Sequence, residues 1–85
     1  MKRKLYAIRD NKIGEFNAPC IFQNHNAALR AFGDMVTGDS KSLVALHPED
    51  FSLYYLGEMD MESGTFDQSV PPSSLAVGTD FVKGE

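Results

Sequence analysis

The sequence has one cysteine and no long hydrophobic run, and each shortage excludes a class of protein. A single cysteine, Cys20, cannot form an internal disulfide bridge, so the chain is not a disulfide-stapled secreted domain. Because Cys20 lies in the apolar run 18–22, we expect a buried, inert thiol in a reducing compartment. No apolar stretch reaches the roughly 20 residues that cross a bilayer, so we expect a cytoplasmic protein without a membrane partner.

Motifs for catalysis and metal binding are also missing. The chain has neither a glycine-rich phosphate loop nor a nucleophile turn, so we predict that it is not an enzyme and needs no cofactor. His25, His47 and Cys20 are the conceivable metal ligands, with Glu49 or Asp50 beside them. Because their spacing matches no established ligand pattern, we interpret them as structural or surface residues and predict no metal site.

Each half of the chain is poor in charge of one sign. Residues 1–45 hold seven Lys or Arg against four acidic residues, whereas residues 46–85 hold one Lys against eight acidic residues. The formal net charge is −4. Such a separation predicts a dipolar surface that can meet an anion with one side or associate head to tail.

The length and composition predict a single domain over residues 1–85. A chain of 85 residues with 42% hydrophobic residues has room for one packed core. Strand-forming residues at 4–9, turn residues at 10–12 and an extended stretch at 13–22 predict a first hairpin. Pro19 lacks an amide hydrogen, so it is expected at an edge, a bulge or a break in the second strand.

The hydrophobic period becomes that of a helix after Asn24. Apolar residues recur at helical spacing as far as Val36, Asn24 or Asn26 can cap the start, and Gly38 can end the helix. Gly33 inside the helix costs about 1 kcal/mol relative to alanine, so we expect another backbone to approach it closely.

Residues 51–59 alternate with a period of two, which predicts the best-defined strand. Its odd-numbered side chains, from Phe51 to Met59, are expected beneath the helix. Gly64 suits a left-handed position in the turn after it, 65–70 returns as a second hairpin, and 75–82 can add an edge strand after the prolines. The predicted fold class is α+β, a small antiparallel sheet of about four strands in the order strand-strand-helix-strand-strand, with one helix packed on one face.

Two strings carry a resemblance to a known family. The segment AALRAFGDMV at 27–36 and the segment HPEDFSLYYLGE at 47–58, followed by an acidic turn and Gly64, resemble the small nonstructural protein of gokushoviruses, the tailless single-stranded DNA phages of the Microviridae. With LYAI at 5–8 and PSSL at 72–75, the resemblance spans nearly the whole chain. Leu46 is a departure, because the family is expected to carry a basic residue there.

The resemblance implies a non-enzymatic phage accessory protein of the host cytoplasm. Its expected role is in single-stranded DNA production or genome packaging, through weak contacts with single-stranded DNA or with phage replication or assembly proteins. A small sheet of this kind is also expected to form a homodimer, which would cover an edge strand. The alternative is an adaptor that binds a host or viral protein without touching DNA.

A basic cluster around the first hairpin is the candidate nucleic-acid site, because single strands are bound by basic grooves with aromatic side chains on which bases stack. The predicted site consists of Lys2, Arg3, Lys4, Tyr6, Arg9, Lys12 and Arg30. The alternative is a solvated strand edge on which Lys and Arg prevent aggregation.

A second candidate site is a protein-interaction surface. It consists of His47, Pro48, Glu49, Asp50, Tyr54 and Leu56. The rigidity of proline and the preference of a helix start for negative charge explain the tetrad 47–50 equally well, since Pro48 can open a single helical turn. For Tyr54 and Leu56 we expect burial beneath the carboxyl-terminal segment, with self-association as the alternative.

Overall fold

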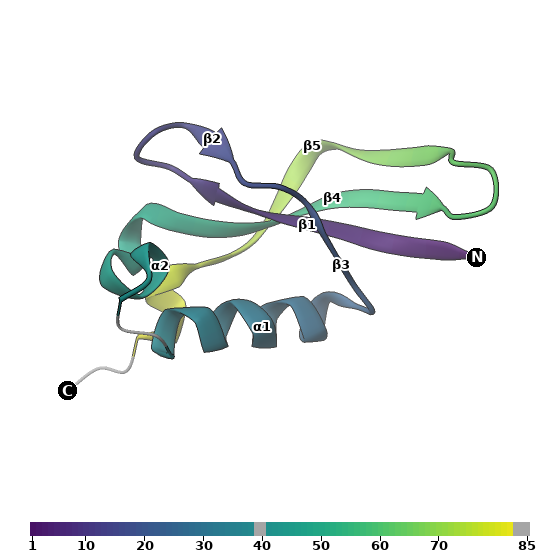
Figure 1. Ribbon diagram of the computed structural model, residues 1–85. Coiled ribbons are helices and arrows are strands. Elements are labelled where there is room, and N and C mark those ends of the chain that lie inside the picture. Colours follow the sequence, from purple (N-terminus) through teal and green to yellow (C-terminus); the bar gives the residue numbers. More distant parts are fainter. Residues whose placement is uncertain (39–40, 83–85) are drawn as a thin grey trace.

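The computed structural model describes residues 1–38 and 41–82 and shows an antiparallel sheet with one long helix on one face (Figure 1). This arrangement confirms the predicted α+β class. The strands are β1 (Lys2–Asp10), β2 (Glu15–Phe16), β3 (Cys20–Phe22), β4 (Phe51–Asp60) and β5 (Phe66–Val77). The helical elements are α1 (His25–Thr37), α2 (Leu43–Leu46) and the short 3-10 helices η1 (Pro48–Asp50) and η2 (Gly78–Phe81).

Strands β1 and β4 form the centre of the sheet, whose order is β2-β1-β4-β5, with β3 also pairing with β1. The second predicted strand is therefore divided into β2 and β3, and Pro19 lies in the break between them. A break is one of the positions that proline tolerates, because it cannot donate to the ladder. Between the two pieces, Asn17 N still donates to Ile8 O at 2.8 Å.

Helix α1 begins and ends close to the predicted positions. The Asn24 side chain accepts a hydrogen bond from Ala27 N at 2.8 Å, and Gly38 is the C-cap. We expected another backbone to approach Gly33 closely, and this was wrong, because the group that approaches it is a side chain. A Cβ added at Gly33 would lie 2.8 Å from Cδ1 of the Phe81 ring in η2.

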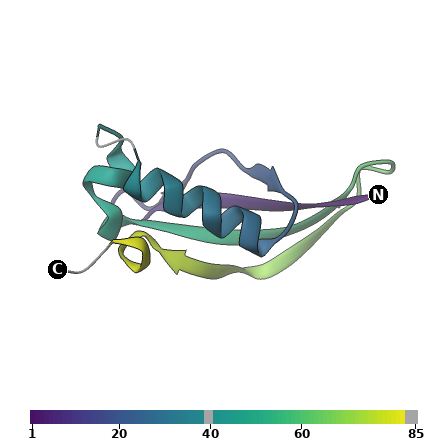
Figure 2. The ribbon, with the colours of Figure 1, turned by 90° about the horizontal axis from the view of Figure 1, so that it is seen from below.

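The core lies between α1 and one face of the sheet. Tyr6 of β1 and Phe32 of α1 are the largest fully buried side chains, at 0% and 1% exposure. The Phe81 ring meets Phe32 edge to face, with 5.6 Å between the ring centroids. The carboxyl-terminal segment therefore closes the core from the α1 side of the sheet (Figure 2).

The alternation of β4 changes phase at a bulge. Phe51, Leu53 and Tyr55 belong to the core or pack against it, as predicted. Tyr55 is opposite Tyr6, but the neighbouring residue of β1, Leu5, is opposite Gly57, so that Leu56 is an extra residue in β4. An inserted residue reverses which side chains share a face, so Met59 lies on the opposite side of the sheet from the helix, and its predicted position beneath the helix was wrong.

The sheet is longer than the helix that covers it. The start of β1 and the hairpin of β4 and β5 project beyond the end of α1, and the molecule measures 47 × 24 × 19 Å (Figure 1). Gly64 has the predicted left-handed conformation, at φ +79°. Strand β5 includes Pro71 and Pro72, but its pairing with β4 is interrupted there, because the register passes from Gln68 opposite Gly57 to Ser73 opposite Tyr55. The prolines therefore lie at an irregularity of an edge strand, where no ladder bond is needed from them.

Two local expectations differ from the structure. Cys20 is exposed and not buried, because β3 lies at the edge of the sheet and leaves the thiol at the rim. Residues 43–46 form the short helix α2, which the sequence analysis did not predict. Its start is capped by Ser42, whose Oγ accepts from Ala45 N at 3.1 Å.

Candidate nucleic-acid interface

Strand β1 divides the predicted basic cluster between the two faces of the sheet. Successive side chains of a strand point to opposite faces, and Tyr6 points into the core beneath α1. Lys2 and Lys4 therefore share the α1 side with Tyr6, whereas Arg3 and Arg9 lie on the opposite side. We call that opposite side the uncovered face, because no helix in the described ranges lies over it (Figure 1).

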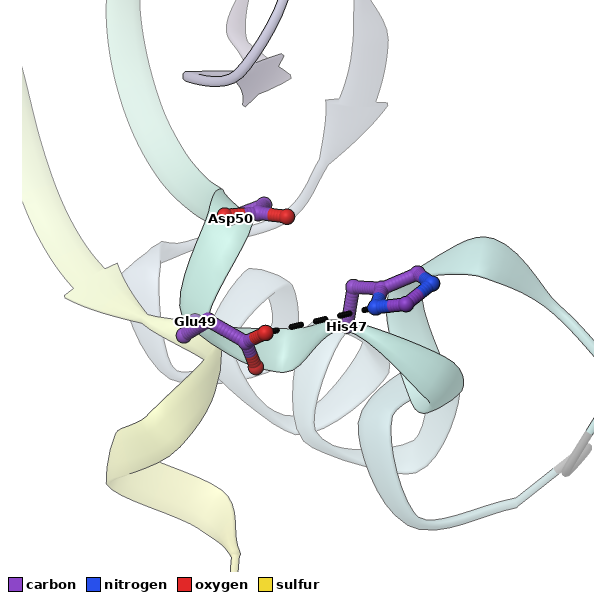
Figure 3. Close-up of side chains that lie close together, drawn as sticks. All are labelled: His47, Glu49 and Asp50. Atoms are coloured by element: carbon purple, nitrogen blue, oxygen red, sulfur yellow. Dashed lines mark ion pairs between the residues drawn. The ribbon is translucent and has the colours of Figure 1, made fainter.

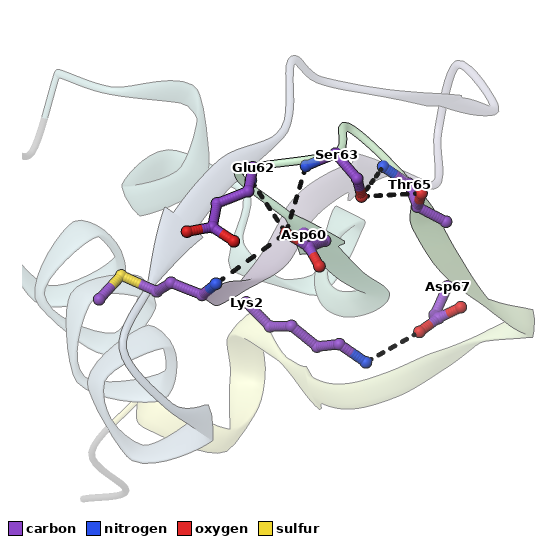
Figure 4. Close-up of polar contacts among 7 residues, drawn as sticks. Lys2, Asp60, Glu62, Ser63, Thr65 and Asp67 are labelled. Atoms are coloured by element: carbon purple, nitrogen blue, oxygen red, sulfur yellow. Dashed lines mark hydrogen bonds and ion pairs between the residues drawn. The ribbon is translucent and has the colours of Figure 1, made fainter.

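The two lysines on the α1 side already have acidic partners. Lys2 Nζ lies 3.3 Å from Asp67 Oδ2, and Lys4 Nζ lies 3.2 Å from Glu58 Oε2. Figure 4 shows Lys2 extended toward Asp67, which lies just after the turn of the second hairpin. A phosphate would have to compete with these carboxylates, so the lysines are poor candidates for a DNA contact.

The uncovered face, by contrast, carries no strand carboxylate within residues 1–38 and 41–82. The register places Glu15 opposite Asp10, Glu58 opposite Lys4, and Asp67 opposite Glu58. By the alternation of the strands, all of the strand acids lie on the α1 side: Asp10, Glu15, Glu58, Asp60 and Asp67. Arg3 and Arg9 form no ion pair with any described residue. The sheet thus separates positive from negative charge across its thickness.

Aromatic side chains accompany the arginines on this face. Arg9 is opposite Phe16 of β2, and its guanidinium carbon lies 5.5 Å from the centre of the Phe16 ring. Phe16 in turn meets Tyr54 of β4 edge to face at 5.2 Å between centroids. Ala7, which lies opposite Tyr54, is 3% exposed although it is on the uncovered face.

The far end of the uncovered face also carries an arginine and an aromatic residue, with Met59 between them. Arg3 of β1 is opposite Met59 of β4, and Met59 is opposite Phe66 of β5. Phe66 is 42% exposed. Between the two ends lie Leu5 and the residue opposite it on β3, Ile21. An arginine and an aromatic residue therefore lie at each end of an apolar strip, but among the described residues the structure gives a contact between them only for Arg9 and Phe16.

Tyr6 must be removed from the predicted nucleic-acid site. Its side chain is fully buried, and its hydroxyl is 2.7 Å from His25 Nδ1, so no base can stack on it. Burial raises the pKa of the Tyr6 phenol above its ordinary value of 10.0, and the neighbouring Tyr55 and Glu58 add to the effect. Tyr6 is a structural residue of the core.

The remaining predicted basic residues are spread over the molecule. Lys12 lies in the exposed turn between β1 and β2. Arg30 is on the exposed side of α1, so the helix separates it from β1. The structure brings together Arg3 and Arg9 on one face and does not add Lys12 or Arg30 to it.

The predicted protein-interaction residues also fall into separate places. Tyr54 belongs to the uncovered face, and Leu56 is the extra residue at the bulge of β4. Both are half-buried. The expectation that the carboxyl-terminal segment covers them was wrong, because that segment pairs alongside β4 and then packs its η2 turn against α1.

The tetrad 47–50 forms a polar corner at the start of β4 (Figure 3). Pro48 opens η1, as predicted, and ligand atoms of His47, Glu49 and Asp50 lie within 4.8 Å of one another. His47 Nδ1 is 4.0 Å from Glu49 Oε2, and both side chains are more than half exposed. Glu49 and Asp50 fit the first turn of η1 electrostatically, so the fold accounts for the group, and the absence of a metal stays a prediction.

Phe16 and Phe66 were missed by the sequence analysis. The available signal for Phe66 is Gly57, because a glycine inside a strand pattern indicates a bulge. A bulge in β4 moves Met59 to the other face, and Phe66 lies opposite Met59. For Phe16 the signal is the hairpin turn, which places this residue opposite Arg9. Neither signal gives the face of the sheet without the register.

Comparison with known proteins places the chain in a phage family. A family model described as "Phage ORF5 protein" matches residues 3–81. The chain belongs to this family. Protein ORF5 of Chlamydia phage 1 is 36% identical to the ORF5-family chain over 64 residues, which cover 72% of this chain and 67% of that relative. The predicted resemblance to a small gokushovirus protein is confirmed.

Two further observations concern this ORF5-family protein. No solved structure matches it. Across residues 1–38 and 41–82, none of the helices combines the length and the apolar composition needed to span a membrane.

Proposed function

We propose that this ORF5-family protein is a non-enzymatic phage accessory protein that acts in the host cytoplasm, in single-stranded DNA production or genome packaging. The proposed action is a direct, weak contact with DNA through the uncovered face. Membership of a phage family supports the setting. The site on the sheet supports the mode of action.

The observation that carries the proposal is the separation of charge across the sheet. Arg3 and Arg9 have no acidic partner in the described part of the chain, and the strand acids all lie on the other side. A local positive surface can therefore meet phosphate although the formal net charge is −4. Arginine suits this role because its planar fork can hold a phosphate with two parallel hydrogen bonds.

The contact is expected to be weak and strongly dependent on salt. Each phosphate neutralised on a single strand contributes about −0.7 to the slope of log K against log salt. Two arginines thus predict a slope of about −1.4 from this face. The acidic remainder of the molecule opposes binding at low ionic strength.

The proposal is tested by fluorescence anisotropy of a labelled DNA oligonucleotide over a salt series. The variant Arg3→Ala with Arg9→Ala should bind several-fold more weakly and should lose most of the salt slope. The matched control is Lys2→Ala with Lys4→Ala. It removes the same formal charge from the same strand, but from side chains that are paired with Asp67 and Glu58 on the α1 side.

The two double variants give a clear decision. A larger loss for the arginine variant than for the lysine variant supports a contact on the uncovered face. Equal losses would show that only the total charge matters and would refute the assignment to that face. An absence of binding at low salt would remove DNA contact altogether and favour the adaptor.

The second candidate function is that of an adaptor or a homodimer that uses the same face. Ile21 is 50% exposed and lies opposite Leu5, so the middle of the uncovered face is apolar. Light scattering on the full chain measures self-association directly. A stable dimer that binds no DNA would favour this second function over the first.

A further inference from the structure

The aromatic rings of the uncovered face specify the kind of DNA that it fits. Phe16, Tyr54 and Phe66 come from three different strands and lie on the same side of the sheet. Phe16 and Phe66 are 43% and 42% exposed, and Tyr54 is half-buried. Hydrophobic side chains placed in this way have no role in the core beneath α1.

We propose that the uncovered face is a stacking platform for single-stranded nucleic acid, on which unpaired bases lie against Phe16, Tyr54 and Phe66 while Arg3 and Arg9 hold the phosphates. This inference rests on the proposed function and adds the structural class of the ligand. Base stacking on aromatic rings needs no particular sequence, because every base has a flat face. The platform is therefore tolerant of sequence.

One end of the platform is already organised. Phe16 is held between the Arg9 guanidinium at 5.5 Å and the Tyr54 ring at 5.2 Å, with 73° between the two ring planes. Arg9 Nη1 also donates to Asn11 Oδ1 at 2.8 Å, which fixes the guanidinium near the ring. A ring held in place loses little conformational freedom when a base stacks on it.

The ligand class follows from charge and shape together. In the part of the chain that the structure describes, the face offers two arginines and no strand carboxylate, which complements a polyanion. It also offers apolar surface around Leu5 and Ile21, which complements bases and not phosphates. A duplex keeps its base faces inside the stack and presents phosphates and groove edges, so it can use the arginines and not the rings.

The test compares two ligands and two pairs of variants on the full chain. Anisotropy is measured with a labelled oligothymidine of about 12 nucleotides and with a labelled duplex of the same strand length. Phe16→Leu and Phe66→Leu keep apolar bulk at exposed positions but remove the ring. The double arginine variant described above tests the phosphate contacts, and circular dichroism checks that each variant is folded.

Tighter binding of the single strand than of the duplex is expected, with roughly a tenfold loss for each leucine variant. A matched control is Met35→Leu, which changes a side chain of similar exposure, 43%, on α1 and should leave binding unchanged.

Three results would overturn the platform, and they separate it from the proposed function. Equal binding of single strand and duplex, unaffected by the leucine variants but weakened by loss of the arginines, would leave DNA contact standing and refute stacking. No binding of either ligand would refute both. A dimer in light scattering that is disrupted by Ile21→Asp, without any DNA binding, would assign the face to a second copy of the chain.

Discussion

The two faces of the sheet use the same strands for opposite purposes. The face beneath α1 contains Tyr6, Leu53 and Phe32 packed together, and its outlying lysines are paired with acids. The uncovered face carries arginines that have no acidic partner among the described residues, and the rings of Phe16 and Phe66, which are about two-fifths exposed. The comparison shows that a basic cluster in a sequence is not one site when it lies on a strand, because neighbouring residues point in opposite directions.

The largest expected difference between the faces is in stability. Phe32→Ala should lower the free energy of unfolding by about 3 to 5 kcal/mol, because it removes a buried ring and leaves a cavity. Phe16→Ala, on the uncovered face, should cost about 1 kcal/mol or less, as surface substitutions usually do. Urea denaturation of both variants checks this. Similar losses would mean that the uncovered face is as much a core as the other.

A substitution at Gly57 tests the bulge of β4, which determines the face of the sheet on which the following side chains lie. Gly57→Ala should cost about 2 kcal/mol or more, because φ is +141° and the new Cβ would overlap Asp67 O of β5. Gly64→Ala is the matched control, since φ is also positive, at +79°, but nothing lies within 4 Å of the added Cβ. Thermal denaturation should rank Gly57→Ala well below Gly64→Ala. The reverse order would contradict the bulge geometry.

The buried phenol of Tyr6 makes the free energy of unfolding depend on pH. Because the pKa of Tyr6 is raised on folding, its contribution is fully present below pH 10 and is lost as the pH rises through the folded-state pKa. The wild-type protein should therefore lose stability above about pH 10 more steeply than Tyr6→Phe. The variant should also lose about 1 kcal/mol at neutral pH with the hydrogen bond to His25. Parallel pH profiles would refute this account.

The smallest expected effect is that of an ion pair on the covered face. Lys4→Ala should lower stability by less than about 1 kcal/mol, because both partners of the Lys4–Glu58 pair are about one-third exposed. Arg3→Ala should leave stability unchanged within the error of denaturation measurements, since Arg3 has no partner among the described residues. For DNA binding the order reverses, and Arg3→Ala should have the larger effect. A result in which Lys4→Ala weakens DNA binding more would contradict the separation of the faces.

Local patterns were enough to predict much of the fold. The cap at Asn24, the end of the helix near Gly38 and the core side chains Phe51 and Leu53 follow from spacing and from the chemistry of single residues. These features depend on near neighbours in the chain. The family resemblance rests on similarly short strings and is confirmed by the match over residues 3–81.

The candidate site could not be predicted in the same way, because it depends on strand register. Nothing local in the sequence shows that Lys4 meets Glu58 or that Arg3 shares a face with Phe66. The bulge at Leu56 is set by pairing between distant segments, and it decides the side on which Met59 lies. Tyr6 was assigned to a surface because its neighbours are charged, but tertiary packing places it in the core.

The most direct test of the uncovered face as a binding surface is a nuclear magnetic resonance titration of the protein with oligothymidine, followed through side-chain signals. Shifts are expected in the ring signals of Phe16, Tyr54 and Phe66 and in the Nε–H signals of Arg3 and Arg9, with the Phe32 ring and Arg30 unchanged. Shifts confined to Arg30 or to the corner at His47, with the rings of the uncovered face silent, would contradict binding at this face.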